Sequence, residues 1–170
     1  MEFSELIKKR YSCKKYDGRP AEAEKLNAVL AAGRLAPTAK NLQEQRIYVL
    51  QSEDALAKMD KVTPCRYGAR TVLCIAFNKE NVYTYPGGSR TSGVEDATIV
   101  ATHMLLAASN VGLDSCWINN FNPDTLAADL GLPENEEILM LMDLGYAAPE
   151  AGPLPNHERR KPLSETVSYL

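Results

Sequence analysis

The sequence predicts an α+β sandwich, with a mixed or antiparallel sheet flanked by helices and one long central helix. Helical and strand patterns follow in a mixed order, namely helices, one strand, a helix, a strand, a long helix and two more strands. A doubly wound parallel sheet would instead alternate strands and helices regularly. The length of 170 residues, of which 45% are hydrophobic and 24% charged, fits one globular domain over residues 1–170.

The first half of the chain contains three helical patterns and two strand patterns. Leu26, Val29 and Leu30 recur at helical spacing, and Pro37 ends that pattern. The strand patterns differ, because RIYVL is rich in β-formers whereas TVLCIAF is a continuous apolar run, typical of a buried strand. The expected helices are residues 3–9, 21–35 and 53–60, and the expected strands are residues 46–50 and 71–77.

The second half centres on a helix expected from Gly93 to Asn110. Glu95 and Asp96 lie in its first turn, where acidic side chains interact favourably with the helix dipole. The rest of this helix has little polar surface, which indicates burial either centrally or against a partner chain. His103 is expected to be a packed helix residue rather than a ligand or base. The other expected elements are a loop at 81–89, strands at 115–118 and 137–146, a helix at 123–130, and a proline-rich tail from residue 147 that wraps over this or another subunit.

The composition argues against several classes of function. A net charge of −3 gives no overall attraction to nucleic acid or to an anionic membrane. The N-terminus lacks the apolar segment of a secretory signal, and the longest apolar run is too short to span a bilayer. The four cysteines are irregularly spaced without a CxxC motif, so we expect reduced thiols in a cytoplasmic protein and no metal site. The absence of GxGxxG and GxxxxGK[ST] argues against the usual nucleotide-binding loops.

Positive charge is concentrated locally in this acidic chain. The stretch KKRYSCKKY, residues 8–16, holds five cations in nine residues. Arg10, Ser12 and Lys14 occupy every second position, and in an extended chain they point to the same side. Together they donate hydrogen bonds without supplying an acceptor carboxylate. This array suits an anion such as phosphate, and a simple solvated surface is the alternative interpretation.

Two segments place hydrogen-bonding side chains beside predicted strands. Before the first strand, Thr38, Asn41 and Gln43 can recognise a heteroaromatic edge, and a capped turn is the alternative. After the strand at 115–118 come Asn119 and Asn120. Asparagine tolerates left-handed backbone angles, so these residues can turn an N–H outward, although a simple turn fits equally well.

A second cationic cluster, at residues 159–161, lies near the other end of the chain and alone is typical of a solvated tail. Taken together and in chain order, these segments resemble the FMN-dependent nitroreductase family. The resemblance covers nearly the whole chain. The matching motifs are RYSCK (10–14), APTAKNLQ (36–43), EDATIVATHMLLAASNVGLDSCWI (95–118), LGYAAPE (144–150) and RKPL (160–163).

The resemblance implies an obligate homodimer with FMN in two clefts between the subunits. Arg10 would meet the FMN phosphate with Ser12 close by, and Arg160, with Arg159, would complete that site. Lys14 would lie near N1 and O2 of the flavin ring, where a cation stabilises the reduced, anionic flavin.

Other contacts implied by the resemblance come from the middle of the chain. Asn119 and Asn120 would offer a backbone N–H to flavin N5, and the segment around Thr38 and Asn41 would contact FMN from the other subunit. The complete set of expected cofactor-binding residues is Arg10, Tyr11, Ser12, Cys13, Lys14, Pro37, Thr38, Ala39, Asn41, Gln43, Asn119, Asn120, Arg159 and Arg160.

The sequence also departs from the family pattern. Lys14 stands where arginine is commoner, Glu44 and Gln45 replace the usual Pro-Trp, and Asn119 and Asn120 stand where many relatives have Glu-Gly. Only a loop at 78–93 precedes the long helix, where larger relatives insert a helix over the flavin. We therefore expect a more open cleft.

The activity implied by the resemblance is that of an FMN-dependent NAD(P)H oxidoreductase with ping-pong kinetics. It would reduce nitroaromatics, quinones or similar small acceptors, with flavin N5 carrying the chemistry and no catalytic side chain. One alternative is a non-catalytic flavin-binding protein, acting as a store or sensor. Another is a flavin-independent interaction domain in which the long helix serves only dimerisation.

Overall fold

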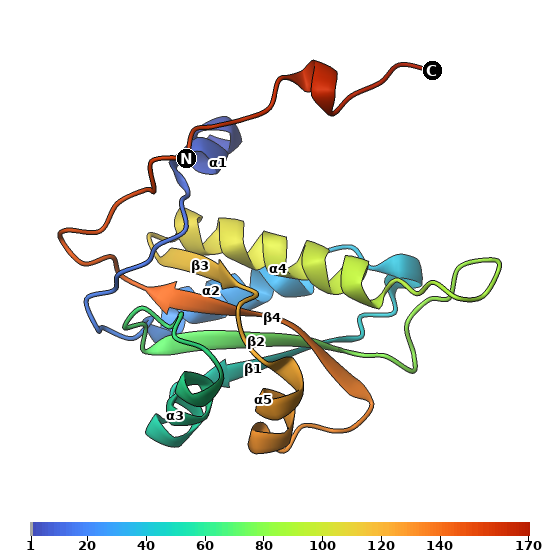
Figure 1. The fold of residues 1–170 in the computed structure, drawn as a ribbon, viewed down its shortest axis with the longest axis horizontal. Coiled ribbons are helices and arrows are strands. Elements are labelled where there is room, and N and C mark those ends of the chain that lie inside the picture. Colours follow the sequence, from blue (N-terminus) through green and yellow to red (C-terminus); the bar gives the residue numbers. More distant parts are fainter. Residues whose placement is uncertain (1) are drawn as a thin grey trace.

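A computed structural model describes residues 2–170 and shows a four-stranded sheet between two layers of helices (Figure 1). The helices are α1 Phe3–Lys9, α2 Ala23–Arg34, α3 Glu53–Val62, α4 Gly93–Asn110 and α5 Pro123–Leu130, and the strands are β1 Gln45–Leu50, β2 Thr71–Asn78, β3 Asp114–Ile118 and β4 Glu136–Gly145. Two short 3-10 turns are η1 Ala39–Asn41 and η2 Leu163–Glu165. The prediction of an α+β fold is confirmed, and every helix and strand expected from the sequence is present.

The sheet has the strand order β1-β2-β4-β3, and its neighbouring strands all pair antiparallel. The two central strands are the most apolar because helices cover both faces. All eight residues of β2 are buried. Helices α2 and α4 cover one face, and α3 and α5 cover the other (Figure 1).

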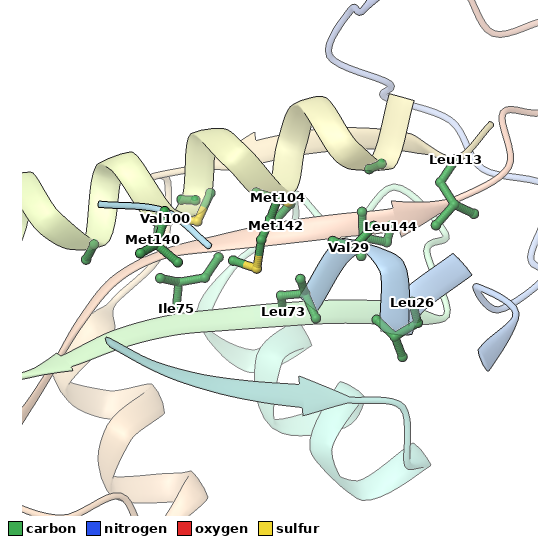
Figure 2. Packing of buried hydrophobic residues seen from close by; sticks show 14 of the residues in the cluster. Leu26, Val29, Leu73, Ile75, Val100, Met104, Leu113, Met140, Met142 and Leu144 are labelled. Carbon is green, nitrogen blue, oxygen red and sulfur yellow. The ribbon is translucent and has the colours of Figure 1, made fainter. Parts of the chain in front are cut away.

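The larger part of the core lies between the sheet and the layer of α2 and α4. Figure 2 shows Val100 of α4 near Met140 of β4 and Met104 near Met142, and Val29 of α2 lies near Leu144. Gly33 of α2 allows this close approach, because a Cβ there would lie 2.7 Å from the Met104 Cγ. Burying each large apolar side chain contributes about 1.5–3 kcal/mol of stability relative to exposure.

Helix α4 is buried on one side only. Val100 and Met104 face the core, while Val94 is 50% exposed and Ile99 is 37% exposed. His103 is also exposed, and its Nδ1 lies 2.9 Å from the Ile99 carbonyl. The expectation that His103 is packed is therefore wrong, since its position faces away from the sheet. The apolar residues on this outer side leave α4 with a surface suited to a partner.

The C-terminal tail passes beside α1 before it extends away (Figure 1). After α1 the chain runs extended along β3, and the Cys13 N–H donates to the Ser115 carbonyl at 3.0 Å. The tail then passes α1, where His157 Nε2 lies 3.4 Å from the Lys8 carbonyl. Beyond that point the tail extends away from the body, and Tyr169 is 97% exposed. Within residues 2–170 no helix combines the length and hydropathy needed to cross a membrane.

Candidate functional site

The segment after α1 is held in place by two buried side chains. Cys13 is fully buried and Tyr16 is nearly so, and both pack against Ala69. Alternation in an extended chain then places Ser12 and Lys14, the two neighbours of Cys13, on the opposite, accessible side. The packing of Cys13 therefore fixes the side to which Ser12 and Lys14 point.

Two arginines from opposite ends of the chain come close together. Arg10 is half-buried directly after α1, and burial lowers its pKa, as does the positive charge of Arg160. Arg160 donates to the main-chain carbonyls of His157 and Arg159. Neither Arg10 nor Arg160 forms an ion pair with any residue in the range 2–170. Two neighbouring guanidinium groups without a carboxylate partner favour binding of an anion.

Arg10 borders a cavity of about 260 Å³ where α1 meets the end of α4. Tyr11, Ser109 and Asp114 also line it. The Asp114 carboxylate already accepts the Ala147 N–H at 2.9 Å, and within residues 2–170 it forms no ion pair with Arg10. Burial, followed by the Asp114 charge, raises the pKa of Tyr11 to about 12, so the phenol stays neutral at physiological pH.

Ser12 and Lys14 line a second cavity of about 310 Å³. Its other walls come from Cys116 and Trp117 of β3 and from His157 in the tail. Ser12 and Lys14 thus share one face, as predicted. Arg10 differs from the prediction, because it lines the neighbouring cavity. No local pattern indicates that His157 belongs here, because its contact with α1 depends on the path of the tail.

The end of β3 meets the loop between α3 and β2. The Thr63 hydroxyl donates to the Asn120 carbonyl at 2.6 Å, and the Asn120 side-chain amide donates to Cys65 Sγ at 3.6 Å. Lys14 Nζ lies 5.9 Å from the centre of the Tyr67 ring in the same loop. Lys14 and Asn120 are therefore brought to one region, bridged by two residues that the motifs did not indicate, Cys65 and Tyr67.

The two asparagines after β3 have different roles in the structure. The Asn119 side-chain oxygen accepts the Trp117 indole N–H at 2.7 Å, and both Asn119 and Asn120 are exposed. Arg159 is also exposed, and the contact found for it with another predicted site residue is its carbonyl accepting Arg160. The contacts of these three residues to a cofactor remain predictions.

The segment from Pro37 to Gln43 lies elsewhere, at the start of α4 (Figure 1). The Ala39 N–H donates to Asp96 Oδ1 at 2.8 Å. Arg10 instead lies near Ser109, thirteen residues further along α4, or about 20 Å at 1.5 Å per residue. A single chain therefore does not bring the two predicted halves of the site together.

This second segment has an unusual backbone. Lys40, Asn41 and Gln43 have φ values of 52°, 57° and 56°, in the left-handed region that non-glycine residues seldom adopt. Hydrogen bonds maintain the conformation, since the Gln43 N–H donates to Thr38 Oγ1 at 3.1 Å. Strained backbone that is held in place in this way is concentrated at binding sites.

No cluster of three potential metal ligands occurs in the part of the chain that the structure describes, residues 2–170. Apart from the Asp114 carboxylate, which already accepts the Ala147 N–H, the polar groups that converge are cations, hydroxyls and amides, which suit an anionic organic molecule better than a cation. Together, the fold and these groups define an α+β sandwich with a cationic seam, which is formed by Arg10 and Lys14 in the segment that runs along β3.

Comparison with known proteins identifies the family. The family model described as "Nitroreductase family" matches residues 7–66 and 64–146. The chain therefore belongs to the nitroreductase family, and the resemblance proposed from its motifs is confirmed.

Individual relatives agree with this assignment over most of their length. A nitroreductase family protein from Clostridium difficile 630 has 39% sequence identity and a TM-score of 0.92, covering 99% of this chain and 98% of its own. An FMN-dependent nitroreductase from Clostridium difficile R20291 has 25% identity and a TM-score of 0.73, covering 92% and 96%. An Archaeoglobus fulgidus protein, provisionally named NADH dehydrogenase/NAD(P)H nitroreductase, is 29% identical and covers 85% of each chain.

Proposed function

We propose that this protein is an FMN-dependent NAD(P)H oxidoreductase that reduces quinones, nitroaromatics or similar small acceptors. The observation that carries the proposal is the pair of unneutralised arginines, Arg10 and Arg160, brought together from the two chain ends. Family membership supports an oxidoreductase, and a relative named as FMN-dependent supports the cofactor.

The residues present fit both ends of FMN, the phosphate and the flavin ring. The phosphate would lie between Arg10 and Arg160, where burial of Arg10 strengthens charge-assisted hydrogen bonds. The ring would extend along β3 into the cavity lined by Ser12, Lys14 and Trp117. Bound FMN would supply hydride transfer between the nicotinamide and the acceptor.

The protein's own residues would orient and tune the site. Lys14 would place positive charge beside the ring, stabilising negative charge there, and Asn120, held by Thr63, would fix the main chain at the end of β3. Thr38, Asn41 and their neighbours would approach from a second copy of the chain. This arrangement follows from the length of α4, which keeps the two half-sites apart in one protomer. The partly exposed apolar side chains of α4 would form part of the dimer contact.

The decisive experiment compares cofactor binding by wild type, Arg10→Ala and Arg34→Ala. Apoprotein is titrated with FMN while flavin fluorescence is followed, and the dimer is checked by light scattering. Losing a charge-assisted hydrogen bond of about 1.5–3 kcal/mol should weaken binding roughly 10- to 150-fold in Arg10→Ala. Arg34 is an exposed arginine at the end of α2, so its variant serves as the matched control.

Addition of NADH or NADPH to the loaded protein then separates an enzyme from a flavin store or sensor. Bleaching of the flavin absorbance within seconds, with recovery on adding a quinone, supports the oxidoreductase. Protein that takes up no FMN, or equal FMN affinity in wild type and Arg10→Ala, would contradict the proposed role of the arginine pair.

A further inference from the structure

Cys65 is the accessible thiol of this protein. Cys13 and Cys74 are fully buried and Cys116 is 3% exposed, whereas Cys65 is partly exposed in the loop between α3 and β2. Burial raises the pKa of Cys74 and of Cys116 to about 12, which keeps both as unreactive thiols. A reagent arriving from solvent therefore meets Cys65 first.

The surroundings of Cys65 favour its thiolate. A hydrogen bond with Tyr67 is the main cause that lowers the pKa of Cys65, and Thr63, Asn120 and the Lys14 charge act in the same direction. The Asn120 amide donates directly to Sγ at 3.6 Å. The thiolate is the nucleophilic form of cysteine, so these contacts increase its reactivity at neutral pH.

A buried acid lies close enough to Cys65 for the two groups to affect each other electrostatically. Asp143 of β4 is fully buried, and neither carboxylate oxygen has a hydrogen-bond partner among residues 2–170. Burial raises the pKa of Asp143 to about 9, and Cys65 is among the nearby groups that affect it. At neutral pH Asp143 is therefore an uncharged acid. It does not oppose a negative charge on Cys65, and it keeps an exchangeable proton in the same cluster.

We propose that Cys65 is a site of covalent modification by quinone-type electrophiles, and that this modification and occupancy of the cofactor cleft exclude each other. The proposal rests on the proposed function, because Lys14 and Asn120, which border Cys65, are assigned there to the flavin ring. Molecules presented to the cleft as electron acceptors would thus also be the class that reacts with its thiol.

The reaction needs no added oxidant or reductant. The Cys65 sulfur attacks a ring carbon of the quinone, a C–S bond forms, and the electron pair moves to a quinone oxygen, which takes a proton from solvent. Loss of the ring proton at the attacked carbon to the second oxygen then gives a hydroquinone thioether. The quinone is reduced to its hydroquinone level and the protein carries the ring. The bulky adduct would lie between Lys14 and Asn120.

The test uses full-length wild type and Cys65→Ser, each treated with 1,4-benzoquinone and, separately, with iodoacetamide. Intact mass and peptide mapping count and locate the adducts between pH 6 and pH 9. Wild type should gain one adduct, at Cys65, and reach half its maximal rate below the pH expected for an ordinary thiol near 8.5. Saturating FMN should slow the reaction at least tenfold, and protein modified beforehand should lose FMN uptake. Asn120→Ala, which removes one contact to the sulfur, should react more slowly at pH 6.5.

Several results would overturn the proposal. Adducts shared evenly among the four cysteines, equal labelling of Cys65→Ser, or undiminished labelling at saturating FMN would each do so. If the protein takes up no FMN but Cys65 still reacts selectively, the proposed function fails together with the mutual exclusion, whereas the modification site itself is supported. If FMN binds normally and Cys65 is inert, the modification site fails while the proposed function stands.

Discussion

Replacing Asp143 with asparagine should make the protein more stable, and increasingly so as the pH rises. The Asp143 carboxyl is fully buried on β4, and its two oxygens have no partner in the described range, residues 2–170. Burial raises its pKa to about 9 from a value of 3.8, and the nearby Arg66 charge offsets only part of that effect. The folded protein therefore retains a proton that the unfolded chain releases above pH 4.

The sign and size follow from this proton. Between about pH 4 and pH 9 the folded state binds one more proton than the unfolded state, so the free energy of unfolding falls by about 1.4 kcal/mol per pH unit. The stability that this proton contributes is fully present below pH 4 and is lost progressively up to about pH 9. At pH 7 the loss reaches about 4 kcal/mol, an upper value because water entering the cluster would reduce it. Asparagine has the same shape and does not titrate.

Urea unfolding of wild type and Asp143→Asn at pH 5 and pH 8, at one protein concentration, measures the effect. The stability advantage of the variant should increase by about 4 kcal/mol between the two pH values. Asp124→Asn is the control, because Asp124 is exposed at the start of α5. If the wild-type and Asp143→Asn stabilities change in parallel between pH 5 and pH 8, burial does not keep this carboxyl neutral and the reasoning is refuted.

Three further substitutions test the packing. Gly93→Ala should destabilise by about 1–3 kcal/mol in thermal unfolding, because a Cβ at this position overlaps the Phe77 ring. Met104→Ala should cost about 2–5 kcal/mol in urea unfolding, because Met104 is fully buried and its removal leaves a cavity. Asp96→Ala should cost about 1–3 kcal/mol and increase hydrogen exchange at the Ala39 amide, which it leaves without its acceptor.

Each packing prediction has an outcome that would contradict it. Gly152→Ala is the control for Gly93→Ala, because a Cβ at Gly152 meets no atom within 4 Å. Equal melting temperatures for the two glycine variants would show that the helix shifts at no cost. A Met104→Ala variant as stable as wild type would mean that the core refills the space, and unchanged exchange at Ala39 would mean that Asp96 does not hold that segment.

Local patterns were sufficient to predict the fold. The continuous apolar run at 71–77 identified a central strand, and the apolar sequence after Glu95 identified α4 with the bounds that the structure shows. Periodicity reports which side chains must be buried, and here burial alone nearly determines each element. It did not reveal that His103 faces outward, because a helix that is apolar almost all round gives no indication of which side faces the sheet.

The candidate site was less accessible to sequence reasoning. The alternation of Arg10, Ser12 and Lys14 correctly indicated an extended segment, because side-chain alternation is a local property of the chain, although the bridge to Ser115 that holds the segment is not. The positions of Cys65 and His157 depend on contacts over long sequence separations, with Asn120 and with α1 respectively. No local spacing encodes such contacts, so these residues emerge only from the folded chain.

The length of α4 has a consequence for how cofactor and subunits would depend on each other. If the cationic seam of one copy is completed by the strained segment of another, an isolated protomer offers only part of the binding free energy. By mass action, dilution would then release the cofactor, and the cofactor would in turn tighten association. An 18-residue helix would thereby couple the abundance of the protein to its capacity to hold a redox group.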